Sequence, residues 1–305
     1  MLTFKAHTKP VYGLAFSPDG RFLLTSSGDE TVKLWEYEGL KLVRELPGSK
    51  FAAPVALSPD DRFIARGGYG VEVWETGSGE SVISTPYPET YADTLAFAPD
   101  GKEIAASESG KSLKRWSLPR GSLLPTSSRG MGQGRDASRF PAGAVAYSPD
   151  GSLIATSFGV NTYTSAGYAS HVCLWDRKGT LRGELKAEHT HGHPTSIVLS
   201  PDGSLLAGIY GPILQVFNVR TKAQIATHKP DKKHFKGLTF TPNGKRLVIV
   251  SNDKSVRLYD TKSWTEVTGY EWKVGRLGCV AVAADGLRMA AGSDSGKVVV
   301  WDVDL

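Results

Sequence analysis

The stretch that decides the fold runs from Phe16 to Trp35 and reads FSPDGRFLLTSSGDETVKLW. In SPDG, Pro18 sets the φ that a turn needs, the Asp19 side chain can bond locally, and Gly20 tolerates a positive φ. The apolar run FLL that follows predicts a buried strand. SSGDE then reverses the chain, and residues 31–35 alternate polar and apolar side chains, as in a strand with one exposed face. This stretch therefore predicts two strands of a β-meander.

The same two signals return along the whole chain. The tight turn and the closing aromatic residue recur at intervals of roughly 40 to 50 residues, near the period of four-stranded propeller blades. The turns centre on Asp19, Asp60, Asp100, Asp150, Asp202, Asn243 and Asp285, and the closing aromatic residues are Trp35, Trp74, Trp116, Trp175, Phe217, Tyr259 and Trp301. The sequence therefore predicts one all-β domain over residues 1–305, a seven-bladed β-propeller with four-stranded antiparallel blades.

The closing aromatic residue precedes an acid or amide in six units: Trp35-Glu36, Trp74-Glu75, Trp175-Asp176, Phe217-Asn218, Tyr259-Asp260 and Trp301-Asp302. On these residues the chain resembles the WD-repeat β-propeller family over essentially its whole length. The resemblance implies a structural hydrogen-bonded set, which the first unit matches with His7, Thr25, Asp29 and Trp35. Other units depart from this set, as unit two does with GGYG. The resemblance also implies that an N-terminal strand within Leu2–His7 pairs into the last blade and closes the ring.

Composition limits the cellular setting. The chain has 36 basic and 31 acidic residues, a net charge of +5. No stretch approaches the roughly 18 continuous apolar residues of a membrane span, and Met1–His7 lacks the build of a signal peptide. We therefore expect a cytoplasmic protein without membrane contact. Cys173 and Cys279 lie in predicted buried strands and are interpreted as reduced core residues, with a disulfide between them as the alternative.

Two connections are longer than the blades need. Residues 158–170 lengthen unit four between its second and third strands, and residues 124–140 lengthen the link between units three and four. In a meander, the second-to-third turns and the inter-blade links lie on one face of the disc, which we call the link face. The SPDG-type turns lie on the opposite turn face, which their aspartates make acidic by count. Long connections concentrate function, so we expect the partner site on the link face around blades 3 to 6.

We expect a protein or peptide to bind there, and the chain to be a monomeric, non-enzymatic scaffold without a cofactor. Tyrosine and arginine are common interface anchors, and arginine binds acidic groups through forked hydrogen bonds, which favours an acidic partner. The candidate partner-binding residues are Tyr12, Arg129, Arg135, Arg139, Tyr163, Tyr168, Tyr210, Lys236 and Trp272. For each aromatic ring among them, packing between blades is an equally compatible interpretation.

Two other classes of function stay open. The first is a small-ligand or metal-binding propeller, hydrolytic or not, that uses the mouth of the central channel. HTHGH places His189, His191 and His193 at alternate positions, but no fourth ligand is evident and we assign no metal. The second is a weak nucleic-acid binder that uses the basic loops near Tyr163 and Tyr168, although a net charge of +5 is small for this role. Because GxSxG, HExxH and paired CxxC motifs are missing from the sequence, we expect no catalysis.

Overall fold

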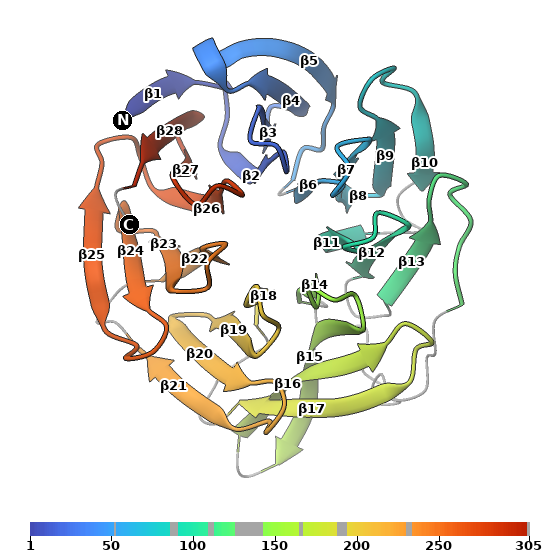
Figure 1. Cartoon of the computed structure of the whole chain (residues 1–305), viewed down its shortest axis with the longest axis vertical. Coiled ribbons are helices and arrows are strands. Elements are labelled where there is room, and N and C mark those ends of the chain that lie inside the picture. The colour runs from blue at the N-terminus through green and yellow to red at the C-terminus, as the bar shows by residue number, and fades with distance from the viewer. Residues whose placement is uncertain are drawn as a thin grey trace.

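The computed structural model describes residues 1–51, 53–85, 91–108, 113–125, 143–164, 167–187, 194–229 and 234–303, and for residues 108, 158–164 and 167–171 it describes the backbone alone. Seven four-stranded sheets surround a central axis as the blades of a ring (Figure 1). This arrangement confirms the predicted seven-bladed β-propeller. The helical segment that the structure describes, the 3-10 turn Glu38–Leu40, is too short to cross a membrane.

The strands of each blade follow one another outward from the axis. Blade 1 contains β2 (Val11–Phe16), β3 (Phe22–Ser27), β4 (Thr31–Glu36) and β5 (Lys41–Pro47), and blade 2 contains β6 (Val55–Leu57), β7 (Phe63–Arg66), β9 (Val71–Glu75) and β10 (Ser81–Thr85). Blade 3 contains β11 (Tyr91–Phe97), β12 (Glu103–Glu108) and β13 (Leu113–Ser117), and blade 4 contains β14 (Val145–Tyr147), β15 (Leu153–Thr164), β16 (Gly167–Asp176) and β17 (Leu181–Ala187).

The remaining blades repeat the pattern. Blade 5 contains β18 (Ser196–Leu199), β19 (Leu205–Tyr210), β20 (Ile213–Asn218) and β21 (Gln224–His228), and blade 6 contains β22 (Phe235–Phe240), β23 (Arg246–Ser251), β24 (Ser255–Asp260) and β25 (Glu266–Glu271). Blade 7 contains β26 (Leu277–Val282), β27 (Arg288–Ser293) and β28 (Lys297–Asp302), and its outer strand is β1 (Leu2–Lys5). Here β1 runs antiparallel to β28, with Leu2 opposite Val300 and Lys5 opposite Lys297.

The sheet of blade 3 has an unusual fourth strand. This strand is β8 (Gly68–Tyr69), which lies between β7 and β9 in the chain of blade 2 but pairs with β11 at Tyr91 and Ala92. At the outer edge of the same sheet, Leu123 forms an isolated bridge to Trp116. A short piece of blade 2 therefore fastens blade 3 at the inner edge.

Apolar side chains of one blade pack on the next, which is where the core lies. Leu24 and Leu34 of blade 1, for example, share one buried cluster with Ile64 and Trp74 of blade 2. Cys173 and Cys279 are free and buried, as predicted, and burial raises the pKa of both thiols to about 12. They therefore stay protonated and unreactive at neutral pH.

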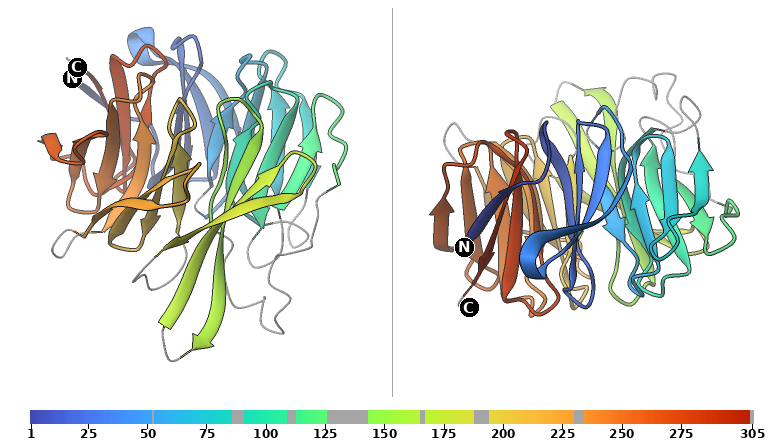
Figure 2. Two further views of the ribbon diagram at one scale, coloured as in Figure 1. Left: turned by 60° about the horizontal axis from the view of Figure 1, so that its bottom comes forward. Right: turned by 90° about the horizontal axis from the view of Figure 1, so that it is seen from above.

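The extra residues of blade 4 lengthen its strands instead of forming a loop. β15 and β16 remain paired as far as Thr164 and Gly167, beyond the last pairing of β14 at Thr156. Figure 2 shows this hairpin projecting well past the body of the disc. It lies between the second and third strands of its blade, where the sequence placed the insertion, and β-pairing continues across it with a register shift between Val160 and Thr164.

The turn face is built from self-supporting turns. In blade 5, Ser200 Oγ donates to Asp202 Oδ1 at 2.5 Å and accepts from Leu205 N at 2.9 Å. Gly203 completes the turn with a φ of 71°. A Cβ atom added to Gly244, in the matching turn of blade 6, would lie 3.7 Å from Pro201 Cδ. Neighbouring turns therefore lie in contact around the ring, although they are remote in sequence.

Four side chains fasten blade 1 as the resemblance implied. His7 Nδ1–H donates to both oxygens of Asp29 at 3.1 Å, and the Thr25 hydroxyl donates to His7 Nε2 at 2.7 Å. The indole N–H of Trp35 then donates to Thr25 Oγ1 at 3.0 Å. Because Asp29 accepts the Nδ1 proton, the imidazole is neutral with Nε2 as an acceptor. Burial lowers the pKa of His7, in agreement with this neutral form.

The Asp29 carboxylate makes the stability of blade 1 depend on pH. Burial by itself raises the pKa of Asp29, but hydrogen bonds from Thr31, Thr8 and His7 outweigh it and lower the pKa to about 2. This value lies below the ordinary 3.8, so the carboxylate stabilises the fold above about pH 4 and loses that contribution as the pH falls to about 2.

We expect Asp29→Asn to lower the free energy of unfolding at pH 7 by roughly 1.5 to 3 kcal/mol, the range for hydrogen bonds to a charged group. Wild type and variant should then converge between about pH 4 and pH 2, because the wild-type carboxylate becomes protonated there. Urea unfolding at several pH values measures both effects. Asp302→Asn, at an exposed position, should have little effect at any pH. A difference between wild type and Asp29→Asn that stays constant down to pH 2 would contradict this assignment.

Candidate functional site

The structure separates the predicted partner-binding residues into three groups. Tyr12, Tyr210, Lys236 and Trp272 have described side chains, whereas Tyr163 and Tyr168 lie on β15 and β16 with the backbone alone described. Arg129, Arg135 and Arg139 lie outside the described residues, as do His189, His191 and His193. In the described part of the chain, no three His, Cys, Asp or Glu side chains gather as they would to hold a metal ion.

Two of the described aromatic rings pack inside or against the fold. Tyr210 is 1% exposed and lies in the buried cluster that joins blades 4 and 5, so its ring is not accessible on the surface of this structure. Burial raises the pKa of its hydroxyl. Trp272 lies 4.4 Å from Trp301 and stacks on Tyr270 at 5.5 Å between ring centroids. For Tyr210, and in large part for Trp272, packing is therefore the role that the contacts support.

A row of exposed aromatic rings crosses the link face from blade 1 to blade 3. Phe51, in the link between blades 1 and 2, lies 4.8 Å from the ring of Tyr69, which lies 5.5 Å from the ring of Tyr91. Tyr12 stands nearby on β2, above Gly28 and the Lys50 backbone. Tyr12, Phe51 and Tyr69 are 38%, 48% and 37% exposed. We call these four side chains, Tyr12, Phe51, Tyr69 and Tyr91, the aromatic row.

A buried arginine positions the centre of the aromatic row. Arg66 occupies in β7 the place that Thr25 has in β3, and it is 7% exposed. Its Nη1 donates to the carbonyls of Gly67 at 3.1 Å and Tyr69 at 3.2 Å, and its Nη2 lies 3.5 Å from Glu72. The buried Arg66 side chain thus fixes the backbone of the GGYG turn through its carbonyl groups. This explains how GGYG departs from the family pattern without loss of order.

Two further constraints keep Tyr69 on the surface. Gly68 and Gly70 on either side of it have φ values of 88° and 87°, a conformation that suits glycine. Tyr69 also pairs with Tyr91 across the boundary between blades 2 and 3. The aromatic row therefore stands on a rigid base, so little ordering entropy is lost when a ligand binds.

Exposed cations lie on the link face, and one of them, Lys50, directly precedes Phe51 of the aromatic row. Exposed basic residues at inter-blade links or second-to-third turns include Lys9, Lys50, Lys254, Lys273 and Arg276, and Lys236 begins the inner part of blade 6. Exposed acids at such positions include Glu30 and Asp294. The link face is therefore basic over the part of the chain that the structure describes, and it suits a partner with acidic groups.

Comparison with known proteins agrees with this architecture. The family described as "WD domain, G-beta repeat" matches residues 1–36, 223–260 and 267–302. The chain contains WD40 repeats. Each matched segment begins on the outer strand of one blade and continues through three inner strands of the next, from β1 to β4, from β21 to β24 and from β25 to β28. Because the repeat is offset from the blade in this way, β1 completes blade 7.

Three relatives resemble most or all of the chain at low identity. The "Serine-threonine kinase receptor-associated protein" of Gallus gallus is 24% identical over 310 residues, which cover 100% of this chain and 83% of the relative. The "WD repeat-containing protein 26 homolog" of Arabidopsis thaliana is 24% identical over 315 residues, which cover 98% of this chain and 50% of the relative. "Protein tipD" of Dictyostelium discoideum is 24% identical, with 83% of this chain and 40% of the relative covered.

The sequence places Tyr69 beside Tyr12 among the aromatic residues near this rim, but it did not identify Phe51, Tyr91 and Arg66. Phe51 carries a usable signal, since a large apolar residue in an inter-blade link has no strand to bury it. Arg66 carries another, because an arginine replaces the small polar residue of the family set. Tyr91 carries none, since its proximity to Tyr69 arises from packing between two blades.

Proposed function

We propose that this WD40 propeller is a non-enzymatic platform that binds another protein or a peptide on its link face. The observation that carries the proposal is the aromatic row, whose exposed rings stand on a rigid base. Exposed aromatic clusters of this kind provide most of the binding energy at protein interfaces. The cations of the link face favour an acidic partner through charge complementarity.

The site that we propose extends from the aromatic row toward blades 3 to 6. The long connection with Arg129, Arg135 and Arg139, and the blade 4 hairpin with Tyr163 and Tyr168, would widen the surface on the same face. We further propose that residues 1–305 act as one domain and as a monomer, in the cytoplasm, where the free thiols stay reduced. One relative is named for its association with a serine-threonine kinase receptor, which supports a protein-binding role here without assigning the partner.

The decisive experiment compares three forms of the protein. Immobilised wild type captures partners from a lysate of the source organism, and the Kd of each purified partner is then measured. We expect Phe51→Ala with Tyr69→Ala to weaken binding by roughly 30-fold or more, because two anchors of about 1 to 2 kcal/mol each are removed. Leu42→Ala with Val43→Ala removes two equally exposed side chains from the outer edge of blade 1 and should leave the Kd unchanged.

A fourth form of the protein tests how far the site extends. Replacing Arg129, Arg135 and Arg139 by Glu should weaken the same complex if the surface reaches the link between blades 3 and 4. A partner that both this variant and the aromatic variant retain at full affinity would place the binding site elsewhere on the molecule.

A further inference from the structure

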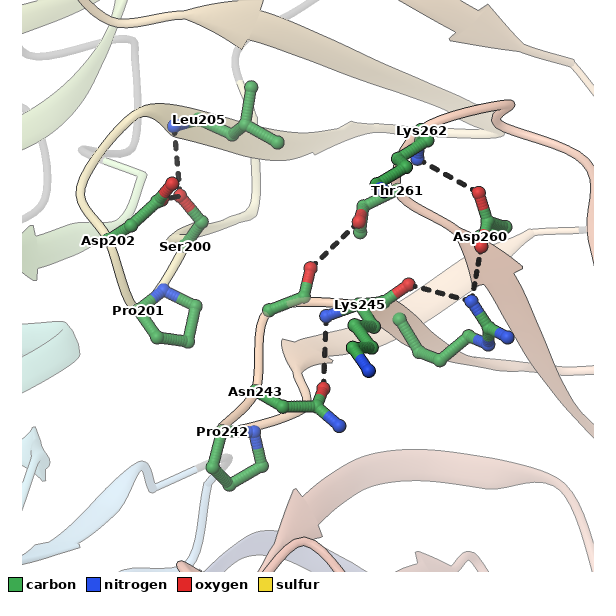
Figure 3. A pocket seen from close by; sticks show the side chains of 12 residues that line it. Ser200, Pro201, Asp202, Leu205, Pro242, Asn243, Lys245, Asp260, Thr261 and Lys262 are labelled. Carbon is green, nitrogen blue, oxygen red and sulfur yellow. Dashed lines mark hydrogen bonds and ion pairs between the residues drawn. The ribbon is translucent and has the colours of Figure 1, made fainter. Parts of the chain in front are cut away.

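A groove on the turn face is separate from everything that the proposed function uses. It lies between the SPDG-type turns of blades 5 and 6 and has a volume of about 690 Å³ (Figure 3). Its walls include Pro201, Leu205, Pro242, Lys245, Asp260 and Lys262. We call it the blade 5/6 groove. Its size is within the range of ligand sites in proteins, roughly 300 to 1,000 Å³.

The two carboxylates that line the blade 5/6 groove are occupied by their own turns. Asp202 accepts from Ser200 Oγ at 2.5 Å and from Ser204 N at 3.0 Å through Oδ1, and from Ser204 Oγ at 2.8 Å through Oδ2. Hydrogen bonds, above all the one from Ser200, lower the pKa of Asp202. The negative charge of Asp202 is therefore stabilised inside the turn, where both of its carboxylate oxygens accept hydrogen bonds.

Asp260 is occupied in the same manner. Its Oδ1 accepts from the backbone N–H groups of Lys262 at 3.0 Å and Ser263 at 2.9 Å, and its Oδ2 pairs with Arg246. These backbone hydrogen bonds lower the pKa of Asp260. Both acids therefore stay ionised, but their oxygens are engaged by groups of their own turns and by Arg246.

The two lysines of the blade 5/6 groove, in contrast, are not held by neighbouring groups. Lys245 and Lys262 are exposed, and neither ammonium forms an ion pair or hydrogen bond with any residue in the described ranges. The blade 5/6 groove thus has a surplus of positive charge that is available to a ligand.

The rest of the lining combines the apolar Pro201, Leu205 and Pro242 with the polar Ser200, Asn243 and Thr261. Pro201, Pro242 and Leu205 are at least partly exposed there, and none of the residues that line the groove is aromatic. Single-stranded nucleic acids depend on aromatic side chains for stacking, so the lining does not favour them. Apolar walls between two ammonium groups fit an apolar side chain flanked by carboxylates.

We propose that the blade 5/6 groove binds an acidic peptide segment, with its carboxylates on Lys245 and Lys262 and an apolar side chain against Pro201, Pro242 and Leu205. The groove would give the propeller a second binding surface on the face opposite the aromatic row. A protein with ligand sites on both faces of the disc can hold two partners at once.

Fluorescence anisotropy with labelled acetyl-EELLEE tests the proposal, with acetyl-QQLLQQ as the uncharged counterpart, at about 50 mM NaCl to limit screening. We expect wild type to bind the acidic peptide, and Lys245→Glu with Lys262→Glu to weaken binding by roughly tenfold or more, because attraction becomes repulsion. Lys41→Glu with Lys102→Glu changes the net charge equally at exposed positions of blades 1 and 3, away from the groove, and should alter the Kd less than about twofold. Thermal unfolding of both variants should match wild type.

Each other outcome overturns the proposal. No binding of acetyl-EELLEE by wild type, or equal binding of acetyl-QQLLQQ, would show that the groove does not recognise acidic peptides. Equal weakening in the two double-lysine variants would assign the effect to overall charge. Tighter binding of a labelled oligo(dT), lost in Lys245→Glu with Lys262→Glu, would make the groove a nucleic-acid site. Phe51→Ala with Tyr69→Ala should leave peptide binding intact. The groove proposal and the link-face proposal can therefore fail independently.

Discussion

Removing Met1 to Lys5 should lower the stability of the propeller by about 4 kcal/mol or more, and Tm by roughly 8 °C or more. The deletion removes β1, and with it every hydrogen bond that covers the outer edge of β28. It also removes Phe4, whose ring lies 5.2 Å from the ring of Trp35. The deletion therefore exposes apolar side chains and leaves the outer edge of β28 unpaired.

Scanning calorimetry of the deletion beside the full chain measures this effect. Phe4→Ala, which keeps the β1 backbone, should cause a smaller loss, and Thr3→Ala, at an exposed position of the same strand, should cause almost none. A Tm that does not change on deletion would show that pairing of β1 with β28 does not hold the ring together.

Glu103→Ala should destabilise the fold by about 3 to 5 kcal/mol, because it leaves a buried charge without its partner. Glu103 and Arg115 are each 4% exposed. The carboxylate accepts from Arg115 Nη2 at 2.8 Å and from the Tyr147 hydroxyl at 2.6 Å, and it pairs with Arg177 Nη2 at 3.2 Å. Since Tyr147 and Arg177 belong to blade 4, this one carboxylate connects two blades.

Asp100→Ala provides the matched control in urea unfolding. Asp100 pairs with the outer side of Arg177 at 2.6 Å, but both side chains are about one-third exposed, so the loss should stay below about 1 kcal/mol. Burial raises the pKa of Glu103, but the hydrogen bonds from Arg115 and Tyr147 outweigh it and lower the pKa. The extra cost of Glu103→Ala should therefore be present at neutral pH and shrink in acid. Equal costs for Glu103→Ala and Asp100→Ala would contradict a buried, cross-blade role.

The number of blades was predictable because its determinants are local. A turn such as SPDG holds itself with the hydroxyl of Ser200 and the carboxylate of Asp202, a few residues apart. The blade 4 insertion was predictable in position but not in form, since pairing between β15 and β16 depends on both strands lengthening together. For these features, the interacting atoms are close in the chain.

The candidate site was less predictable. Tyr12 and Tyr210 were predicted alike as partner-binding residues, but Tyr12 is exposed on the link face whereas Tyr210 occupies the core between blades 4 and 5. Both residues stand at strand ends near the same rim, and sequence alone does not say which rim positions the next blade covers. The aromatic row also lies over blades 1 to 3, whereas the long connections predicted a partner site around blades 3 to 6.

The sequence by itself determined seven meander units, their turns and the four-residue network of blade 1, because those contacts arise within one unit. Only the tertiary structure decided which side chains meet across units: Phe51 with Tyr69 and Tyr91, Glu103 with Arg177, and the wall that two turns form around Lys245. The physical reason is that the ring brings neighbouring blades into contact through side chains tens of residues apart. Whether a given residue becomes surface or core is then a property of the blade beside it.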